Sequence, residues 1–269
     1  MDSFEVIQGA GPIVLGQPHG GTYVPADVQA CLNENGRALA DTDWHIARLF
    51  EGLLPEATVV RSLVHRYVID ANRDPSGASL YPGQNTTALV PVTDFDGQPI
   101  WQDGKAPDAA EIEQRWLAYH APYHAALEQE LARVKAQHGV AILFDCHSIR
   151  SRIPFLFEGD LPVFNTGSNL GTTCDARIED AVHRIAQGSG LPSVLNGRFK
   201  GGWTTRHYGQ PETGTHAIQM EIAQRAYMQE SAPWTYDETR ANSLRRHLQD
   251  MLTSLNELAL SGQLTGESQ

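Results

Sequence analysis

Short apolar segments alternate with amphipathic ones along this chain, and this alternation constrains the fold more than any other feature. Four segments rich in apolar and β-branched residues predict strands, the second as one long strand or two short ones: 12–18, 57–70, 139–147 and 215–224. Apolar side chains recur at helical spacing in four others: 41–53, 108–137, 174–187 and 233–260. The alternation predicts an α/β fold in three layers, with a mostly parallel or mixed sheet flanked by helices on both faces.

Residues that typically begin or end helices mark two of the helical segments. Asp41 and Asp108 stand at the starts of 41–53 and 108–137, and aspartate is a preferred N-cap. Gly139 lies just past the end of the second segment, where glycine commonly ends a helix. Pro122 lies inside that segment and predicts a kink, because proline cannot donate the helical hydrogen bond.

Residues 71–107 form a long excursion that is rich in Gly, Pro, Asp, Asn and Thr and shows no clear periodicity. Long loops in compact domains are usually functional, as lids or as walls of a substrate site. With 269 residues, of which 41% are hydrophobic, the chain can bury a substantial core. We therefore expect a single domain over residues 1–269, with 71–107 as a loop on it.

The net charge is −12, from 20 basic and 32 acidic residues, and the basic residues form no tract. This charge opposes nucleic-acid binding, which normally needs a basic face, but it permits a small anionic substrate in a locally positive site. No apolar run approaches the roughly 18 to 20 residues that span a bilayer, so no membrane association is expected. With no signal-peptide pattern and no CxxC pair among three cysteines, we expect a cytoplasmic protein. The oligomeric state is not indicated.

Two histidines close predicted strands. His19 follows 12–18 at a Gly-Gly turn, and His147 ends 139–147. Ligands of α/β sheets bind at the carboxyl ends of the strands. Asp145 lies two positions before His147, so both side chains should share one face of the strand, where a carboxylate can fix the tautomer of a metal-binding imidazole. Together the two histidines predict a site for a divalent metal ion.

The third metal ligand should come from another part of the chain, since catalytic zinc usually takes three protein ligands and leaves one position for water. The segment 41–45 offers Asp41, Asp43 and His45. Because Asp41 is expected to cap a helix, Asp43 is the preferred ligand, and Asp41 and His45 stay alternatives. Imidazole and carboxylate donors suit zinc, and they also suit cobalt, manganese or iron.

Glu221 is a carboxylate set in the apolar segment 215–224, between Met220 and Ile222. Apolar surroundings raise the pKa of a carboxyl group toward the working range of a general base. Water activated by a metal ion needs such a proton acceptor. Beside a metal site, Glu221 is therefore predicted to be the base rather than a member of a structural ion pair.

Three arginines lie next to these segments. Arg73 follows 57–70, and Arg150 and Arg152 come three and five residues after His147. Guanidinium groups bind carboxylates bidentately, so these arginines predict a site for a small dicarboxylate. The alternative for each is an ion pair with a carboxylate of the protein.

Three further residues lie in glycine-rich sequence near Glu221: Arg206, His207 and His216. We consider all three as groups that contact the substrate. Arg206 and His207 are the preferred donors to the oxyanion that develops during amide hydrolysis.

Two other patterns are given less weight. His120 and His124 have the i, i+4 spacing of the zinc-binding HExxH helix, but position 121 is Ala, so the glutamate of that motif is missing. Cys146 precedes His147 and could be a nucleophile, but a small buried residue in a core strand is the preferred interpretation.

The chain resembles the N-formylglutamate amidohydrolases from about residue 12 to about residue 230. No single motif makes the resemblance specific; the number of motifs and the order in which they occur do. The motifs that carry it are PHGGTYVP, DTDWHIARLF, YVIDANRD, LYPGQNT, LFDCHSIRSRIP, NTGSNLGTTCD and NGRFKGGWTTRHYGQPETGTHAIQMEIAQRAYM.

The resemblance implies hydrolysis of N-formyl-L-glutamate to formate and L-glutamate, a step of histidine degradation. It also implies a divalent metal, most often zinc, and a fold related to the zinc carboxypeptidases. His19, Asp43 and His147 would be the metal ligands and Glu221 the base, while Arg73, with Arg150 or Arg152, would hold the glutamate carboxylates. One departure from a carboxypeptidase pattern is Thr22, where that pattern has Glu three residues after the first histidine. The alternatives are hydrolysis of another N-acyl amino acid or small peptide, and a binding protein without turnover.

Overall fold

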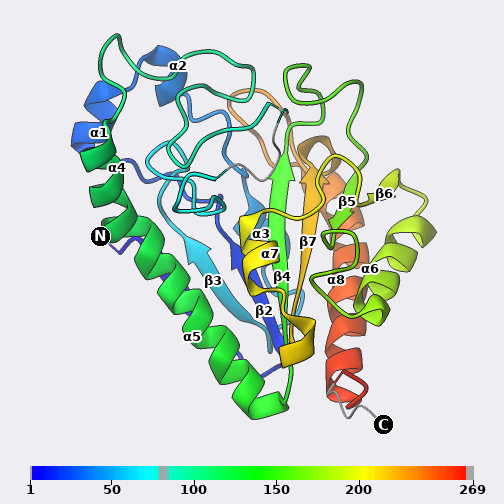
Figure 1. Cartoon of the computed structure of the whole chain (residues 1–269). Coiled ribbons are helices and arrows are strands. Elements are labelled where there is room, and N and C mark those ends of the chain that lie inside the picture. Colours follow the sequence, from blue (N-terminus) through cyan, green and yellow to red (C-terminus); the bar gives the residue numbers. More distant parts are fainter. Residues whose placement is uncertain (1, 79–82, 84, 265–269) are drawn as a thin grey trace.

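A computed structural model describes residues 2–78, 83 and 85–264 of the chain (Figure 1). Its centre is a mixed sheet in the order β1-β3-β2-β4-β7-β5-β6. The strands are β1 Phe4–Ile7, β2 Ile13–Gln17, β3 Thr58–Ser62, β4 Ala141–Ile149, β5 Phe164–Gly167, β6 Ser193–Leu195 and β7 Thr215–Ala223. The four central strands, β3, β2, β4 and β7, are parallel, whereas β1 and β5 each pair antiparallel with a neighbour.

Helices cover both faces of this sheet. The α-helices are α1 Ala26–Cys31, α2 Glu34–Arg37, α3 Ile46–Phe50, α4 Ala109–Arg115, α5 Ala121–His138, α6 Ala176–Gly188, α7 Trp203–Tyr208 and α8 Glu238–Leu260. Shorter turns are the π-helical η1 Trp116–His120 and the 3-10 helices η2 Pro211–Thr213 and η3 Gln224–Ala226. Figure 1 shows α5 on one side of the sheet, with α6 and α8 on the other.

Strand β4 supplies side chains to two separate hydrophobic clusters, because successive residues of a strand point to opposite faces. Phe144 and Cys146 pack with α3, α6 and α8, whereas Leu143 packs with α5. This arrangement confirms the predicted three-layer α/β fold. It also places Cys146 in a fully buried apolar setting, which raises the pKa of its thiol well above the usual value. The interpretation of Cys146 as a core residue is confirmed.

The predicted strands 12–18, 139–147 and 215–224 and the helix 174–187 are confirmed by β2, β4, β7 and α6. Asp108 caps α4 through a bond from the Glu111 amide, and Gly139 ends α5 in the left-handed conformation. The helix between them is interrupted by the π-helical turn η1, which ends two residues before Pro122. Three strands, β1, β5 and β6, were not predicted; each has at most four residues and lies toward an edge of the sheet.

Three predicted elements are wrong in extent. The helix 41–53 is only α3, and Asp41 does not cap it: its carboxylate accepts from the Tyr67 hydroxyl and the Phe95 amide instead. The strand 57–70 ends at Ser62, after which the chain turns and buries its apolar side chains in a third cluster. The helix 233–260 begins at Glu238, where Asp237 is the N-cap. In the first two cases tertiary contacts override the local apolar pattern, whereas in the third a local N-cap sets the start of the helix.

The described residues of the excursion 71–107 form no helix and add no strand to the sheet. Residues 79–82 and 84, which belong to the LYPGQNT motif and its approach, lie outside the described part. None of the helices built from described residues has the length and apolar character that a bilayer crossing requires.

Candidate metal centre and active site

The carboxyl ends of the parallel strands bring the predicted residues together. His19 follows β2 by two residues, and His147 lies near the end of β4. In the register between β4 and β7, His147 pairs directly with Glu221. Two residues opposite each other on neighbouring strands point to the same face, so the sheet itself places the predicted base beside a predicted metal ligand.

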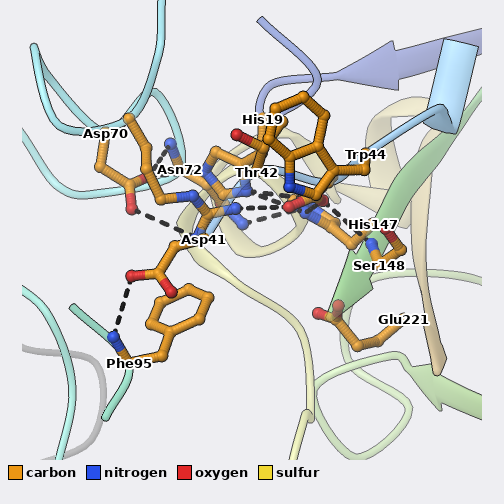
Figure 2. A network of polar contacts seen from close by, with 12 residues as sticks. His19, Asp41, Thr42, Trp44, Asp70, Asn72, Phe95, His147, Ser148 and Glu221 are labelled. Atoms are coloured by element: carbon orange, nitrogen blue, oxygen red, sulfur yellow. Dashed lines mark hydrogen bonds and ion pairs between the residues drawn. The ribbon is translucent and has the colours of Figure 1, made fainter. Parts of the chain in front are cut away.

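The imidazoles of His19 and His147 meet at this edge (Figure 2), and the Asp43 carboxylate lies close to both. His19 Nδ1 lies 3.2 Å from His147 Nδ1, and Asp43 Oδ2 lies 3.9 Å from the first and 3.5 Å from the second. All three side chains are buried. Among the described residues, these three form the one group of histidine, cysteine or acidic side chains with the spacing of a metal site.

The two other candidates for the third ligand have different contacts. Asp41 lies in the network with Tyr67 and Phe95. His45 adopts a left-handed backbone conformation at the start of α3, and its Nε2 donates to the Trp234 carbonyl at 2.6 Å. Only Asp43 of the three joins the two histidines.

Each imidazole is oriented by a carboxylate of its own, in addition to Asp43. His19 Nε2 donates to Asp70 Oδ1 at 2.7 Å, and His147 Nε2 lies 3.0 Å from Asp145 Oδ1. These contacts direct both Nδ1 atoms toward the centre, which is the usual support for histidines that bind a metal. The predicted pairing of Asp145 with His147 is present, whereas Asp70 was not foreseen.

The Asp43 carboxylate is held by two donors. Arg66 Nη2 donates to Oδ1 at 2.6 Å, and the Ser148 amide donates to Oδ2 at 2.9 Å. Burial opposes ionisation of Asp43, but Arg66 and the two histidines lower its pKa below the usual value. The site therefore holds a fixed anionic donor, as a cation site requires.

The surroundings of the two histidines shift their pKa values in opposite directions. Burial, assisted by the nearby charge of Arg66, lowers the pKa of His19 to about 4, so its ring is neutral at pH 7. Burial would also lower the pKa of His147, but the charge of Asp145 and bonds to Asp145 and Asp43 raise it well above the usual value. Only a ring without a proton on Nδ1 can ligate a cation through that atom, so binding at His147 requires its neutral form.

Glu221 is a buried carboxyl group beside this cluster. Burial raises its pKa to about 8, and the neighbouring His147 charge opposes part of that rise. Gln219 Nε2 donates to Glu221 Oε2 at 3.3 Å, while Gln219 Oε1 accepts from the Gly202 amide at 2.6 Å. A carboxyl group with such a pKa can both take and return a proton near neutral pH.

A cavity of about 630 Å³, including its open mouth, lies over the cluster. Four of the predicted site residues line it: His19, Arg73, His147 and Glu221. Asp43 is buried and is not part of the lining. The lining also includes four residues for which the sequence predicts no role: Arg66, Asn72, Arg198 and Gln219.

The other predicted site residues are not brought to this cavity. Arg150 Nη2 pairs with Asp96 at 2.8 Å, and the exposed Arg152 pairs with Asp160 at 2.8 Å. On α7, Arg206 donates to the Gly201 carbonyl, and the exposed His207 stacks on Trp203. His216 lies near the opposite end of β7 from Glu221, and accepts from the Asp175 amide.

Side chains of the types that bind metal ions lie beside a carboxyl group with a raised pKa, under a cavity at the carboxyl edge of an α/β sheet. These features define the class of the protein as an enzyme with an acid–base site. Residues 11–228 match the model of the N-formylglutamate amidohydrolase family. The chain belongs to this family.

Named relatives agree with this assignment. The chain is 46% identical over 252 residues to an N-formylglutamate deformylase of Pseudomonas aeruginosa, with 92% of this chain and 94% of the relative covered. It is 43% identical to an N-formylglutamate deformylase of Pseudomonas putida, with 92% and 93% covered. A crystal structure of an N-formylglutamate amidohydrolase from Ralstonia eutropha superposes with a TM-score of 0.81 at 26% identity and covers 97% of this chain and 100% of that one.

Proposed function

We propose that this protein hydrolyses N-formyl-L-glutamate to formate and L-glutamate, with a divalent metal ion held by His19, Asp43 and His147. The observation that carries the proposal is the triangle of donor atoms with Glu221 beside it on the neighbouring strand. Family membership supplies the substrate, since the two Pseudomonas relatives are named N-formylglutamate deformylases.

The donor atoms fit a metal ion. Ligand atoms about 2.0 to 2.1 Å from a tetrahedral zinc ion lie about 3.3 Å apart. The three distances here are 3.2, 3.5 and 3.9 Å, so small side-chain movements suffice to close the triangle. Two imidazoles and one carboxylate favour zinc, and cobalt, manganese and iron accept the same donors.

The proposed mechanism assigns proton transfer to Glu221. When bound, the ion would polarise the formyl carbonyl and acidify water, as hydrolytic metal ions do. Glu221 takes a proton from the attacking water and returns it to the departing amine of glutamate. Gln219 holds the Glu221 carboxyl group in place between these two transfers. Because Arg206 and His207 do not line the cavity, we assign no step to them.

Arg73 is the proposed partner of a substrate carboxylate. It lines the cavity, and its guanidinium is held by the Thr87 carbonyl and hydroxyl at 2.9 and 2.8 Å. Arg150 and Arg152 are engaged with protein carboxylates, so we do not place them at the substrate.

The cytoplasmic location stays a prediction from the sequence.

The experiment that tests the proposal is formate release from N-formyl-L-glutamate by the purified protein, before and after chelation and with zinc added back. We expect activity that disappears with chelator and returns with the metal. Activity in protein that elemental analysis shows to be free of metal would contradict the mechanism. A metal-loaded protein that releases no formate would favour a different N-acyl amino acid or small peptide, or a binding protein without turnover.

A further inference from the structure

Helix α7 packs against the face of the sheet that carries His147. It contacts β4 and β7 (Figure 1), and its Tyr208 lies in the same hydrophobic cluster as Leu143 of β4. Asp145 and His147 follow Leu143 at intervals of two residues along β4, so all three side chains point to this face. The helix therefore covers a proposed metal ligand and the carboxylate that orients it.

One side chain of α7 bonds to that carboxylate. The Thr205 hydroxyl donates to Asp145 Oδ2 at 2.8 Å, while Asp145 Oδ1 lies 3.0 Å from His147 Nε2. Thr205 and Asp145 are both fully buried. One carboxylate oxygen is thus held by the helix, and the other faces the imidazole. Loss of the hydroxyl would leave Oδ2 without a donor from the described residues, at a buried position where an unmade hydrogen bond is costly.

The carboxylate behind His19 is held in a comparable way. Asp70 Oδ1, which accepts from His19 Nε2, also accepts from the main-chain amide of Asn72 at 2.8 Å. A substitution leaves such a main-chain donor in place, whereas Thr205 supplies its donor from a side chain. The support of the carboxylate on the His147 side can therefore be removed by a single substitution.

Other bonds hold α7 in place independently of the Thr205 hydroxyl. The Gly202 amide donates to Gln219 Oε1 at 2.6 Å. The Thr204 amide donates to Asn72 Oδ1 at 2.8 Å. Since these main-chain donors remain when the hydroxyl is removed, the helix should stay docked, and the change should be confined to the carboxylate that the hydroxyl holds.

We propose that Thr205 is a positioning residue of the metal centre. Its hydroxyl fixes the rotation of the Asp145 carboxylate, so that Oδ1 stays directed at His147 Nε2 and Nδ1 stays the atom that can ligate a metal ion. This inference rests on the metal site of the proposed function. Outer partners of ligating histidines usually contribute about 10- to 100-fold to metal affinity, and a hydroxyl that acts through such a partner contributes part of this.

The test measures the zinc affinity of the folded, metal-free protein by competition with a chromogenic chelator. Thr205→Val replaces the hydroxyl by a methyl group of similar size, and we expect zinc affinity to fall about 3- to 10-fold, the share of one hydrogen bond. Thr205→Ser keeps the hydroxyl and should stay within about twofold of the wild type.

The matched control is Thr204→Val. Thr204 precedes Thr205 on the same helix and is equally buried, but its hydroxyl has no hydrogen-bond partner among the described residues. We therefore expect this variant to keep the zinc affinity of the wild type.

A double-mutant cycle shows whether Thr205 acts through Asp145. Asp145→Asn removes the charge that orients His147, and in that background we expect Thr205→Val to lower zinc affinity less than about twofold. Additive losses would mean that Thr205 supports the site by another route and would overturn the proposal. If Thr205→Val does not fold, Thr205→Ala gives the same comparison with a smaller side chain.

Urea unfolding of every variant, with chelator present, separates stability from affinity. As long as the metal-free protein is folded before zinc is added, a lower stability does not change its zinc affinity. Wild-type affinity in Thr205→Val, or an equal loss in Thr204→Val or Thr205→Ser, would overturn the proposal. Zinc binding that depends on Thr205 in a protein that releases no formate would contradict the proposed reaction alone and leave the assignment of Thr205 intact.

Discussion

Two pairs of histidines lie close together in this protein, and they are used differently. His19 and His147 are 128 residues apart in sequence, and their Nδ1 atoms lie 3.2 Å apart in the fold. His120 and His124 are one helical turn apart, with ring centres separated by 4.4 Å. The second pair has the spacing of a known zinc motif, yet the first has the geometry of a metal site.

The carboxylates around each pair explain the difference. The strand-end pair has Asp43 between its rings and an orienting carboxylate behind each ring. The helical pair donates instead to backbone carbonyls: His120 Nε2 to Arg73 at 3.0 Å, and His124 Nε2 to Ala71 at 2.7 Å. The helical pair thus supports the turn that carries Asp70 and Asn72. Histidine spacing alone does not define a metal site; the anionic third ligand and the orienting carboxylates do.

The largest expected effect separates the two pairs directly. In His19→Gln one ligand is lost, so we expect substoichiometric zinc after dialysis and formate release at background. In His124→Gln the ligands remain, and we expect the wild-type zinc content. Elemental analysis of both variants measures this. Full zinc in His19→Gln, or its loss in a folded His124→Gln, would reverse our assignment of the pairs.

A second prediction concerns the base. In HExxH helices the glutamate lies next to the first histidine, but here Ala121 occupies that position and the proposed base comes from β7. Glu221→Gln should keep the metal and lower kcat about 10²- to 10⁴-fold, the usual share of general acid–base catalysis. Glu130→Gln, which alters a buried glutamate paired with Arg133 outside the site, is the matched control and should keep its turnover. Wild-type turnover in Glu221→Gln would remove Glu221 from this role.

The positions of the strand-end histidines and of the proposed base could largely be predicted from the sequence, because β2, β4 and β7 are apolar runs whose ends are easily recognised. Since parallel strands end at one edge, His19, His147 and Glu221 could be placed together without a structure. Asp70 and Arg66 could not. They lie in the segment 57–70, whose β-branched residues predict a strand, whereas the chain leaves the sheet after Ser62.

The arginines show a second limit of the sequence. Arg150 and Arg152 closely follow His147, a predicted metal ligand, and this favours a role at the substrate. Their carboxylate partners, Asp96 and Asp160, come from loops whose position depends on the tertiary fold. Arg198 lies 51 residues after His147 in sequence and reaches the cavity only through the packing of its loop. Where loops carry the side chains, closeness to a site residue in sequence is therefore a weak predictor of closeness in the fold.

A smaller effect is expected from the orienting carboxylates. Asp70→Asn keeps a hydrogen-bond acceptor for His19 Nε2 but removes the charge that favours its ligating tautomer. We expect zinc affinity to fall about 10- to 100-fold, the usual cost of losing such support. Competition with a chromogenic chelator measures this affinity. Asp94→Asn, at a buried aspartate outside the site, should leave it unchanged; equal losses in the two variants would point to a general structural effect.

The smallest expected effect tests whether the helical pair is purely structural. Burial, with the nearby charge of His120, lowers the pKa of His124 from 6.5 to about 3. The unfolded chain therefore binds a proton at this position at a higher pH than the folded protein does. The stability contributed by the neutral ring is complete above about pH 6.5 and is lost as the pH falls from there toward 3.

His124→Gln keeps an amide donor for the Ala71 carbonyl and removes this titration. We expect its free energy of unfolding to fall less steeply with acid than that of the wild type, by up to about 1.4 kcal/mol per pH unit. Urea unfolding at pH 7, 6 and 5, with chelator in every sample, measures the slope without a contribution from metal affinity. His138→Gln, at the end of the same helix, is the control for loss of a half-buried histidine. Equal slopes in His124→Gln and the wild type would mean that His124 takes up its proton in the folded protein as readily as in the unfolded chain, and hence that burial does not lower its pKa.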